Sequence, residues 1–327
     1  KPNRRDILRL AAMAPAFALP ALSLATPARA QLGAPGIDNP AHFHFTIGAA
    51  KITILSDGFF SMPTSGLGVN ADPKEVQSLL EQHYLSPTEG YSHTNHMYVE
   101  LGEAKVLVDV GSGTRWLPTA GRLLANMEAA GISPDAITHV VITHAHPDHI
   151  WGIRDEFDEA IFPQAEYIIG ETEHSYWTQD GLVDKVAPEA QQFVLGAVNS
   201  IAAEGVEWTL AAAGHEVAPG IRLISTPGHT PGHMSLVVES EGKQVMALGD
   251  SMSHAVLNFA HPEWFNGFDS DGAQTVATRQ SLLDMAAADK IAVLVYGEII
   301  AFDTPDAVRS NPRVQEAYLG SMEEQGH

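Results

Sequence analysis

The chain of 327 residues contains no cysteine. This absence excludes disulfide bonds, thiolate metal sites and a cysteine nucleophile. Basic side chains are also scarce: 18 lysines and arginines stand against 40 aspartates and glutamates, which gives a formal net charge of −22. Such a charge disfavours binding to nucleic acids or anionic lipid and favours a small neutral substrate. An apolar fraction of 45% is enough for one large or two small domains with a proper core.

Residues 1–30 have the composition of an export signal rather than of a folded segment. The stretch has a basic head with the pair Arg4 and Arg5, an apolar run of signal-peptide length, and a small-x-small end at residues 28–30. It resembles a twin-arginine signal, which implies a periplasmic or secreted protein. A short membrane anchor or a disordered tail are the alternatives. No later segment approaches the roughly 20 apolar residues that span a bilayer, so we expect no stable membrane insertion.

The rest of the chain alternates between strand-like and helix-like segments. We expect a Pro/Gly-rich linker over residues 31–44, a main domain over 45–290 and an atypical C-terminal segment over 291–327. Within the main domain, apolar β-branched runs such as "AITHVVIT" are typical of buried strands, and "TAGRLLANMEAAG" has apolar residues at helical spacing with a glycine stop. Such segments recur in two similar passes, roughly 45–200 and 205–300. The pattern predicts an α/β fold with two facing sheets and helices on the outside.

One short motif, "THAHPDH", carries most of the chemical information. In an extended segment, residues two apart point to the same side, so His144 and His146 can hold one ion together. Pro147 keeps His146 extended and forces a turn after it. Asp148 and His149 then leave on the other side, where they can hold a second ion. Three histidines and a carboxylate crowded into one turn are costly to bury without a shared partner, and a metal ion is such a partner.

Two later fragments complete the pattern: "TPGHTPGH" at residues 226–233 and "LGDS" at residues 248–251. With "HAHPDH" they resemble the signature of the metallo-β-lactamase superfamily, H-x-H-x-D-H followed by a distant histidine and then by an aspartate that closes a strand. The resemblance covers about residues 45–290 and implies the αββα sandwich of that family, two facing mixed sheets with outer helices. The ligands that it implies are His144, His146 and His233 for a first metal ion, Asp148 and His149 for a second, and Asp250 as a bridge between them.

Two such ions imply hydrolytic chemistry. Ions about 3.5–4 Å apart hold a bridging hydroxide that is nucleophilic at neutral pH, and their charge stabilises the oxyanion that forms. Asp148 and Asp250 are therefore candidate catalytic residues as well as ligands. Histidine and carboxylate ligation suits Zn²⁺ best, although Mn, Fe or Co can occupy the same kind of site. Asp109, in "LVDVG", resembles the family's buried aspartate beneath the site and is expected to orient a ligand, with a structural turn aspartate as the alternative.

Within the superfamily, the chain most resembles exported methyl parathion hydrolases and the related lactonase and arylesterase branch. The matching segments are "ITILSDG", "LVDVGSG", "GRLLANMEAAG", "THAHPDH" and "GHTPGHMSLVVES". This resemblance implies a small neutral ester, lactone or organophosphate triester as substrate, and an aromatic leaving-group pocket. The candidate pocket residues are Trp177 and Phe193, with His93 and His96 at the mouth and His254 as a further pocket and catalytic residue. Each of them has an ordinary structural role as the alternative.

The C-terminal segment departs from the family pattern. The family supplies one more ligand for the second metal ion, a histidine that ends the strand after the helix at 273–288, but this chain has no histidine between His261 and His327. Glu298 lies within a residue or two of the expected place and is a candidate oxygen ligand. Residues 291–327 instead resemble the end of ATP-binding subunits of branched-chain amino-acid ABC transporters. A fused or frame-shifted gene, a joining of two sources, or chance similarity would each explain this. Since the chain has no GxxxxGK[ST] loop, ATP binding is not implied.

The leading expectation is therefore an exported metal-dependent hydrolase with a small-molecule substrate. A glyoxalase II-like thioesterase or a β-lactamase would keep the metal ions and change the pocket. A protein that binds metal but is catalytically impaired by its altered C-terminal segment is the third alternative. No nucleic-acid partner is expected, and a homodimer that forms through an arm at residues 59–92 is one option for its assembly.

Overall fold

The structure is a computed structural model, and it describes residues 40–288, 291–295 and 298–303. The predicted export signal at residues 1–30, most of the predicted linker, and residues 304–327 lie outside the described residues. The same is true of the Glu298 side chain, so its predicted role as an oxygen ligand stays a prediction.

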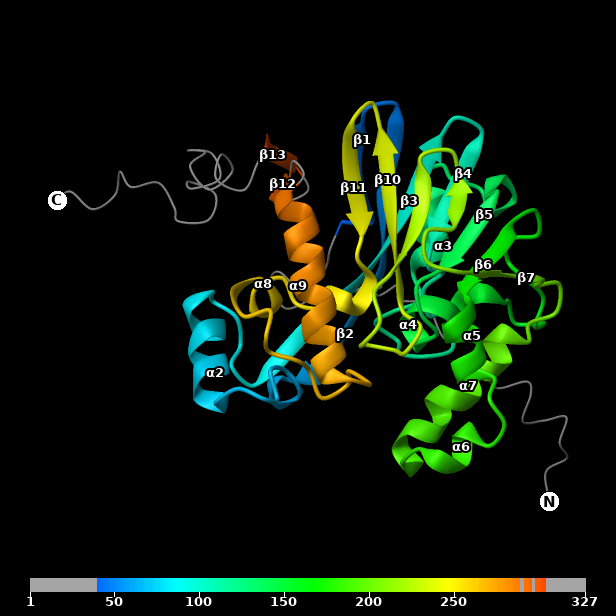
Figure 1. Ribbon diagram of the computed structural model, residues 1–327. Coiled ribbons are helices and arrows are strands. Elements are labelled where there is room, and N and C mark those ends of the chain that lie inside the picture. The colour runs from blue at the N-terminus through cyan, green and yellow to red at the C-terminus, as the bar shows by residue number, and fades with distance from the viewer. Residues whose placement is uncertain (1–39, 289–290, 296–297, 304–327) are drawn as a thin grey trace, which may run out of the picture. The chain divides into compact units, whose positions relative to one another are not determined.

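Two sheets form the centre of the molecule (Figure 1). The larger sheet runs in chain order through β1 (His42–Ile47), β2 (Ala50–Pro63), β3 (Glu89–Leu101), β4 (Ala104–Val108), β5 (His139–Ile142), β6 (Glu166–Gly170) and β7 (Trp208–Ala211). Its first four strands are antiparallel and its last four, from β4 onward, are parallel. The smaller sheet has the order β11 (Lys243–Ala247), β10 (Met234–Ser240), β9 (Ile221–Ser225), β8 (Glu216–Ala218). It is antiparallel throughout rather than mixed as predicted.

The two sheets face each other across a shared apolar core. Alternate residues of a strand point to opposite faces of its sheet. In β4, Val106 and Val108 point to the smaller sheet, where they join Leu223 and Leu236, whereas Leu107 points to the other side. The near-continuous apolar runs of β4, β5 and β6 are thus explained by burial on both faces. The predicted arrangement of two facing sheets is confirmed.

Helices cover the outer face of the larger sheet. Leu123 and Met127 of α3 (Leu123–Ala129) and Val194 and Ile201 of α7 (Gln191–Ile201) share a core with Leu107 of β4. The other helices near this face are α4 (Pro147–Ile150), α5 (Glu171–Trp177) and α6 (Leu182–Lys185). The short 3-10 turns are η1 (Thr64–Gly66), η2 (Pro134–Ala136), η3 (Trp151–Ile153), η4 (Pro188–Ala190) and η5 (Gly249–Met252).

The last helix of the described residues, α9 (Gly272–Ala288), lies against the smaller sheet at the end of β9 (Figure 1). There the Thr278 hydroxyl donates to the Pro227 carbonyl oxygen at 2.5 Å. After α9, β12 (Ile291–Val295) and β13 (Glu298–Asp303) pair as an antiparallel hairpin. Among the described residues, none of the helices combines the length and the apolar character that a membrane crossing requires.

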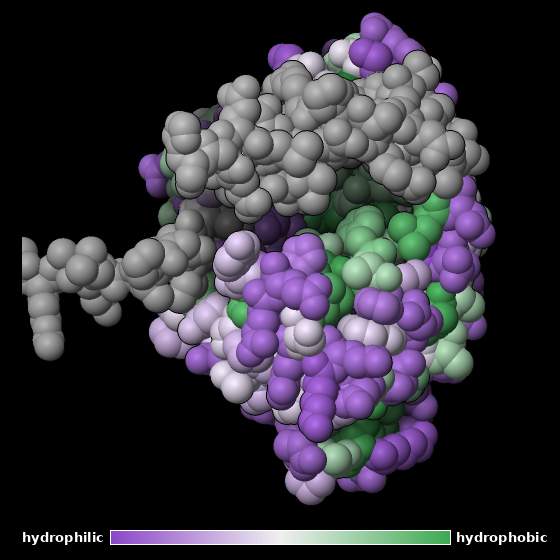
Figure 2. Space-filling view, turned by 90° about the vertical axis from the view of Figure 1, so that its left-hand side faces the viewer, coloured by the Kyte–Doolittle hydropathy of each residue, from purple (hydrophilic) through white to green (hydrophobic). Residues whose placement is uncertain are grey.

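Part of the segment at 59–92, the predicted dimer-forming arm, packs on its own chain, and the homodimer stays a prediction. Asp72 caps α2 (Pro73–Gln82) by accepting from the Lys74 N–H at 2.9 Å, which satisfies one of the free donors of the first turn. Val76 and Leu80 bury the inner face of this helix against Trp264 and α8 (Leu257–Ala260). Figure 2 faces this side and shows mostly hydrophilic residues, with hydrophobic ones gathered in a recess.

The first strand begins earlier than the predicted domain boundary at residue 45. β1 starts at His42, inside the predicted linker, because it pairs with β2 in a register that places Phe45 opposite Ile52. Phe45 packs against the core between the sheets. The packing of Phe45 holds residues 42–44 in the strand. Their composition, which is typical of a linker, did not indicate this.

Candidate metal centre

The predicted metal ligands come together where loops of both sheets meet. His144 and His146 follow β5 of the larger sheet, and Asp148 and His149 lie in the short helix α4 directly after them. As expected for the residue before a proline, His146 is extended, with φ −74° and ψ 161°. The β9–β10 loop at 226–233 and Asp250 of η5 come from the smaller sheet.

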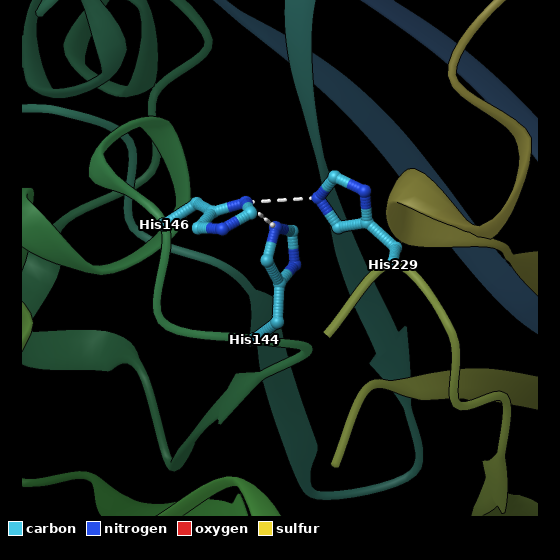
Figure 3. A group of neighbouring side chains, drawn as sticks. All are labelled: His144, His146 and His229. Carbon is cyan, nitrogen blue, oxygen red and sulfur yellow. Dashed lines mark hydrogen bonds between the residues drawn. The ribbon is translucent and has the colours of Figure 1, made fainter. Parts of the chain in front are cut away.

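Three imidazoles converge on one point (Figure 3). His146 Nδ1 lies 3.1 Å from His144 Nε2 and 2.8 Å from His229 Nε2. A tetrahedral zinc ion with bonds of about 2.0–2.1 Å separates its nitrogen ligands by about 3.3 Å. The observed spacing is close to that value. His144, His146 and His229 therefore form the first candidate ligand set.

The outer hydrogen bonds of these rings leave the inner nitrogens free to bind a cation. His229 Nδ1 faces the Asp269 carboxylate at 3.0 Å, and since a carboxylate only accepts, Nδ1 carries the proton. His144 Nδ1 lies 3.0 Å from the Thr143 hydroxyl, whose own proton goes to Asp109 at 2.9 Å. His144 Nδ1 is thus also the protonated nitrogen. The Nε2 lone pairs of both rings point into the cluster, which is the tautomer that a metal ion requires.

A second ligand set lies beside the first. His149 Nε2 is 3.3 Å from Asp148 Oδ2 and 3.4 Å from Asp250 Oδ1. The other oxygen of Asp250, Oδ2, lies 3.4 Å from His229 Nε2. The carboxylate of Asp250 therefore faces both ligand sets, as a bridging ligand must. His149 Nδ1 donates to Asp109 Oδ2 at 2.8 Å, so Asp109 lies beneath the site and orients a ligand, as the resemblance implies.

His233 differs from its predicted place among the first ligands. Its Nε2 accepts the backbone N–H of Asp250 at 3.1 Å, and its Nδ1 faces the Thr226 hydroxyl at 2.8 Å. The lone pair that would bind a metal ion is thus already used inside the protein. The structure brings His229, four residues earlier in "TPGHTPGH", into the position that the sequence analysis gave to His233.

The electrostatics of the two ligand sets differ. Burial lowers the pKa of His146 to about 3, and burial also holds the pKa of His144 and His233 well below the usual range. These rings are neutral at pH 7, the form that binds metal. Burial acts on His149 in the same direction, but the charges of Asp148 and Asp109 outweigh it and raise its pKa well above the usual range.

We predict that the affinity of the second ligand set for Zn²⁺ rises with pH, by up to about tenfold per unit. The raised pKa of His149 means that its ring carries an extra proton at neutral pH, and an ion that binds Nε2 must displace it. The lowered pKa values of His144 and His146 mean that these two rings of the first set have no such proton to lose. Zinc titrations at pH 6, 7 and 8 that resolve the two ions test this, and equal slopes for both would contradict it.

Two acidic residues that the sequence analysis missed support the first ligand set. Asp269 accepts from His229 and lies 3.5 Å from the guanidinium of Arg279, a fully buried side chain of α9. Glu173 of α5 is fully buried and accepts hydrogen bonds from both metal-ligand loops. Neither stands next to a ligand in the sequence, so only the folded loops reveal their proximity.

A largely apolar cavity of about 420 Å³ opens on the candidate metal centre at His146, Asp148, His229 and Asp250. Its aromatic lining consists of Phe60, Tyr91, Trp116, Phe193 and Phe268. Phe193 thus has the predicted place, and its contact with a substrate stays a prediction. The other aromatic residues come from distant loops and strands that no sequence motif connects.

Two predicted pocket residues lie elsewhere. Trp177 is buried and absent from the cavity lining; its indole N–H donates to Glu173 at 2.6 Å and its ring meets the His146 ring edge-on at 5.8 Å. His96 is also buried, because it lies inside β3 and its side chain is covered within the fold. Together with His93, it lines a second cavity of about 260 Å³, which borders the candidate metal centre at Asp148, His149 and Asp250.

His254 does line the larger cavity. Its Nδ1 accepts the backbone N–H groups of Val256 and Leu257, both at 3.2 Å. Burial lowers the pKa of His254, so the ring is neutral and carries its single proton on Nε2. The ring can therefore donate a hydrogen bond from Nε2, and its catalytic role stays a prediction.

The family of the chain follows from its sequence match. The model of the metallo-β-lactamase superfamily matches residues 90–298, and the chain belongs to this superfamily. A second model, described as branched-chain amino acid ATP-binding cassette transporter, matches residues 298–324. The predicted resemblance of the C-terminal segment to such a transporter subunit is thus confirmed.

Curated relatives include lactonases. The chain is 29% identical over 151 residues to an N-acyl homoserine lactonase of Bacillus sp, which covers 46% of this chain and 52% of that protein. It is 25% identical over 189 residues to Glyoxylase B2 of Dictyostelium discoideum, with 53% of each chain covered. The chain thus spans about half the length of the curated relatives that it matches.

Solved structures share the fold. The structure of AidC, a dizinc quorum-quenching lactonase in complex with a product, has a TM-score of 0.66 at 23% identity and covers 76% of this chain and 87% of that one. The hydrolase AbOPH of the β-lactamase superfamily has a TM-score of 0.70 at 23% identity, with 82% and 98% covered. The predicted metallo-β-lactamase fold is confirmed.

Proposed function

We propose that the chain is a zinc-dependent hydrolase that cleaves a neutral lactone or ester carrying an apolar group. The observation that carries this proposal is the convergence of His144, His146 and His229, with Asp250 facing both this set and His149. The names of the lactonase relatives support the substrate class. When bound in such a site, divalent cations lower the pKa of water and polarise a carbonyl group.

The residues of the chain supply binding and orientation. Asp109 and Asp269 hold protons of His149 and His229 on the outer ring nitrogens. The inner nitrogen of His229 is therefore ready to bind, and that of His149 binds once its extra proton is displaced. The aromatic lining of the cavity excludes water and packs against the apolar part of a substrate. The Nε2–H of His254 is available as a donor for a substrate oxygen.

The charge of the cavity favours a neutral substrate. Its described lining includes Asp148 and Asp250 and has no lysine or arginine. An anionic substrate would find no countercharge from these side chains. A thioesterase of the glyoxalase II type is the second candidate, favoured by the match to Glyoxylase B2. The lining charge weighs against it where the thioester is anionic.

Metal removal and a substrate panel test the proposal. We expect a chelator to abolish hydrolysis of acyl lactones and p-nitrophenyl esters, and Zn²⁺ to restore it, because the converging nitrogens are proposed to act by holding the metal ion. A lactone series with growing acyl chains, compared with an organophosphate triester, a β-lactam and an anionic thioester, then identifies the class. We expect long acyl chains to lower KM through burial against the aromatic lining.

The Phe193→Ala variant tests the role of the cavity in binding the acyl chain. It is expected to raise KM for long-chain lactones while leaving short-chain lactones nearly unchanged, because Phe193 lines the cavity and its apolar side chain cannot bind a metal ion. Full activity after complete metal removal would contradict the proposed function. Two bound ions without turnover of any substrate would favour the catalytically impaired alternative.

We also propose that residues 1–30 direct export to the periplasm or the medium. The paired arginines, the apolar run and the small-x-small end support this. N-terminal sequencing of the protein recovered outside the cytoplasm is expected to begin at Gln31.

A further inference from the structure

Glu173 is a buried carboxylate with an unusually complete set of donors. Its Oε1 accepts from the Ala145 N–H at 3.0 Å and the Trp177 indole N–H at 2.6 Å. Its Oε2 accepts from the Thr230 hydroxyl at 2.7 Å and the Gly232 N–H at 3.0 Å. The side chain is fully buried, so these four bonds replace the water that an exposed carboxylate would bind.

The donors belong to the two loops that carry the first ligand set. Ala145 stands between His144 and His146, and Thr230 directly follows His229. One carboxylate therefore joins a loop of the larger sheet to a loop of the smaller sheet. The approach is close: a Cβ on Gly232 would lie 2.0 Å from the Glu173 backbone nitrogen, so only glycine lets the loop reach this helix.

The four groups that donate hydrogen bonds to Glu173 are neutral, so none of them balances the negative charge of its carboxylate. Burial raises the pKa of this carboxyl group, in keeping with the cost of a buried negative charge. A divalent cation held by the neighbouring histidines would supply that countercharge through a medium of low dielectric constant.

We infer that Glu173 is a positioning residue that fixes the distance between the two loops, so that the inner nitrogens of His144, His146 and His229 keep the spacing of a single ion. This inference rests on the proposed metal-dependent function. Glu173 is absent from the lining of the substrate cavity, and its hydrogen bonds from Ala145 and Gly232 hold the backbone on either side of the ligands rather than the ligand side chains.

The Glu173→Gln variant tests the inference, because it keeps the size of the side chain and replaces one acceptor oxygen by an NH₂ group. In either orientation that group meets a backbone N–H, either of Ala145 or of Gly232, so one loop is pushed away. We expect the first zinc ion to bind about 10–100-fold more weakly, as for other groups that orient metal ligands. Competition with a chromophoric chelator measures this without any substrate.

The Glu171→Gln variant is the matched control, since Glu171 lies two residues away on the same helix and is exposed. Its zinc affinity is expected to stay within about twofold of the unchanged chain. The visible spectrum of bound Co²⁺ gives a second readout, which is expected to change in Glu173→Gln and not in Glu171→Gln. If Glu173→Gln does not fold, Thr230→Val removes one donor, keeps the charge, and is expected to weaken zinc in the same direction.

Unchanged zinc affinity and an unchanged cobalt spectrum in the folded Glu173→Gln variant would overturn the inference, even if the variant melts at a lower temperature. For Thr230→Val, an unchanged zinc affinity would have the same meaning. Failure of the unchanged chain to bind Zn²⁺ would instead contradict the proposed function, so the two failures are distinguishable.

Discussion

The His229→Ala variant is expected to lose the first metal ion and to lower kcat/KM at least about 10³-fold, or about 4 kcal/mol of transition-state stabilisation. His229 supplies one of three converging nitrogens, and its Nε2 also lies 3.4 Å from Asp250 Oδ2. Removal of this ring leaves a cation only two nitrogens in the first set. Metal analysis of the purified variant and lactone hydrolysis measure the two effects.

The His233→Ala variant tests whether His229, as in the structure, or His233, as the sequence predicted, is the third ligand of the first ion. His233 accepts the Asp250 N–H with its Nε2 lone pair, so this ring supports the fold rather than the ion. Its removal is expected to lower the free energy of unfolding by about 2–3 kcal/mol and to leave the three converging nitrogens in place. The folded His233→Ala protein should therefore retain the first ion. The reverse ranking, with metal lost in His233→Ala and kept in His229→Ala, would restore His233 as the ligand.

The Asp250→Asn variant is expected to bind at most one ion tightly and to lose at least about 10³-fold in kcat/KM. The carboxylate faces His149 with Oδ1 and His229 with Oδ2, so both oxygens are needed. An amide of the same size offers one oxygen and one NH₂ group, which repels the cation that it faces. The number of bound ions, measured by elemental analysis, and the hydrolysis rate together test this.

Asp180→Asn is a suitable control for Asp250→Asn, because it makes the same chemical change at an exposed position. It is expected to change neither metal content nor turnover. If Asp250→Asn kept two ions with near-normal turnover, a bridging role for this carboxylate would be wrong.

The sequence predicted the parts of the fold that depend on local pattern. The apolar runs of β4, β5 and β6 and the helical spacing of α3 are visible in the chain because each element buries a regular set of residues. The start of β1 was missed, since its pairing depends on register with β2 rather than on its own composition.

The sequence predicted the type of candidate site, a metal centre of histidines and carboxylates, but not every residue in it. "HAHPDH" places its side chains through local geometry alone, so His144, His146, Asp148 and His149 lie together as expected. The repeat in "TPGHTPGH" offers two equivalent histidines, and only the path of the loop decides that His229 points inward. Trp177 was misplaced for a similar reason, because a bond to Glu173 four residues earlier draws it into the core.

The ligands of the first set are divided between the two sheets: His144 and His146 follow β5, whereas His229 follows β9. An ion held there is a removable cross-link between the halves of the sandwich, and folding becomes linked to the free concentration of metal. At about 100 times the dissociation constant, one ion that binds only the folded chain adds about 2.7 kcal/mol to its stability. The supply of metal would then govern how long the protein survives, in addition to whether it is active.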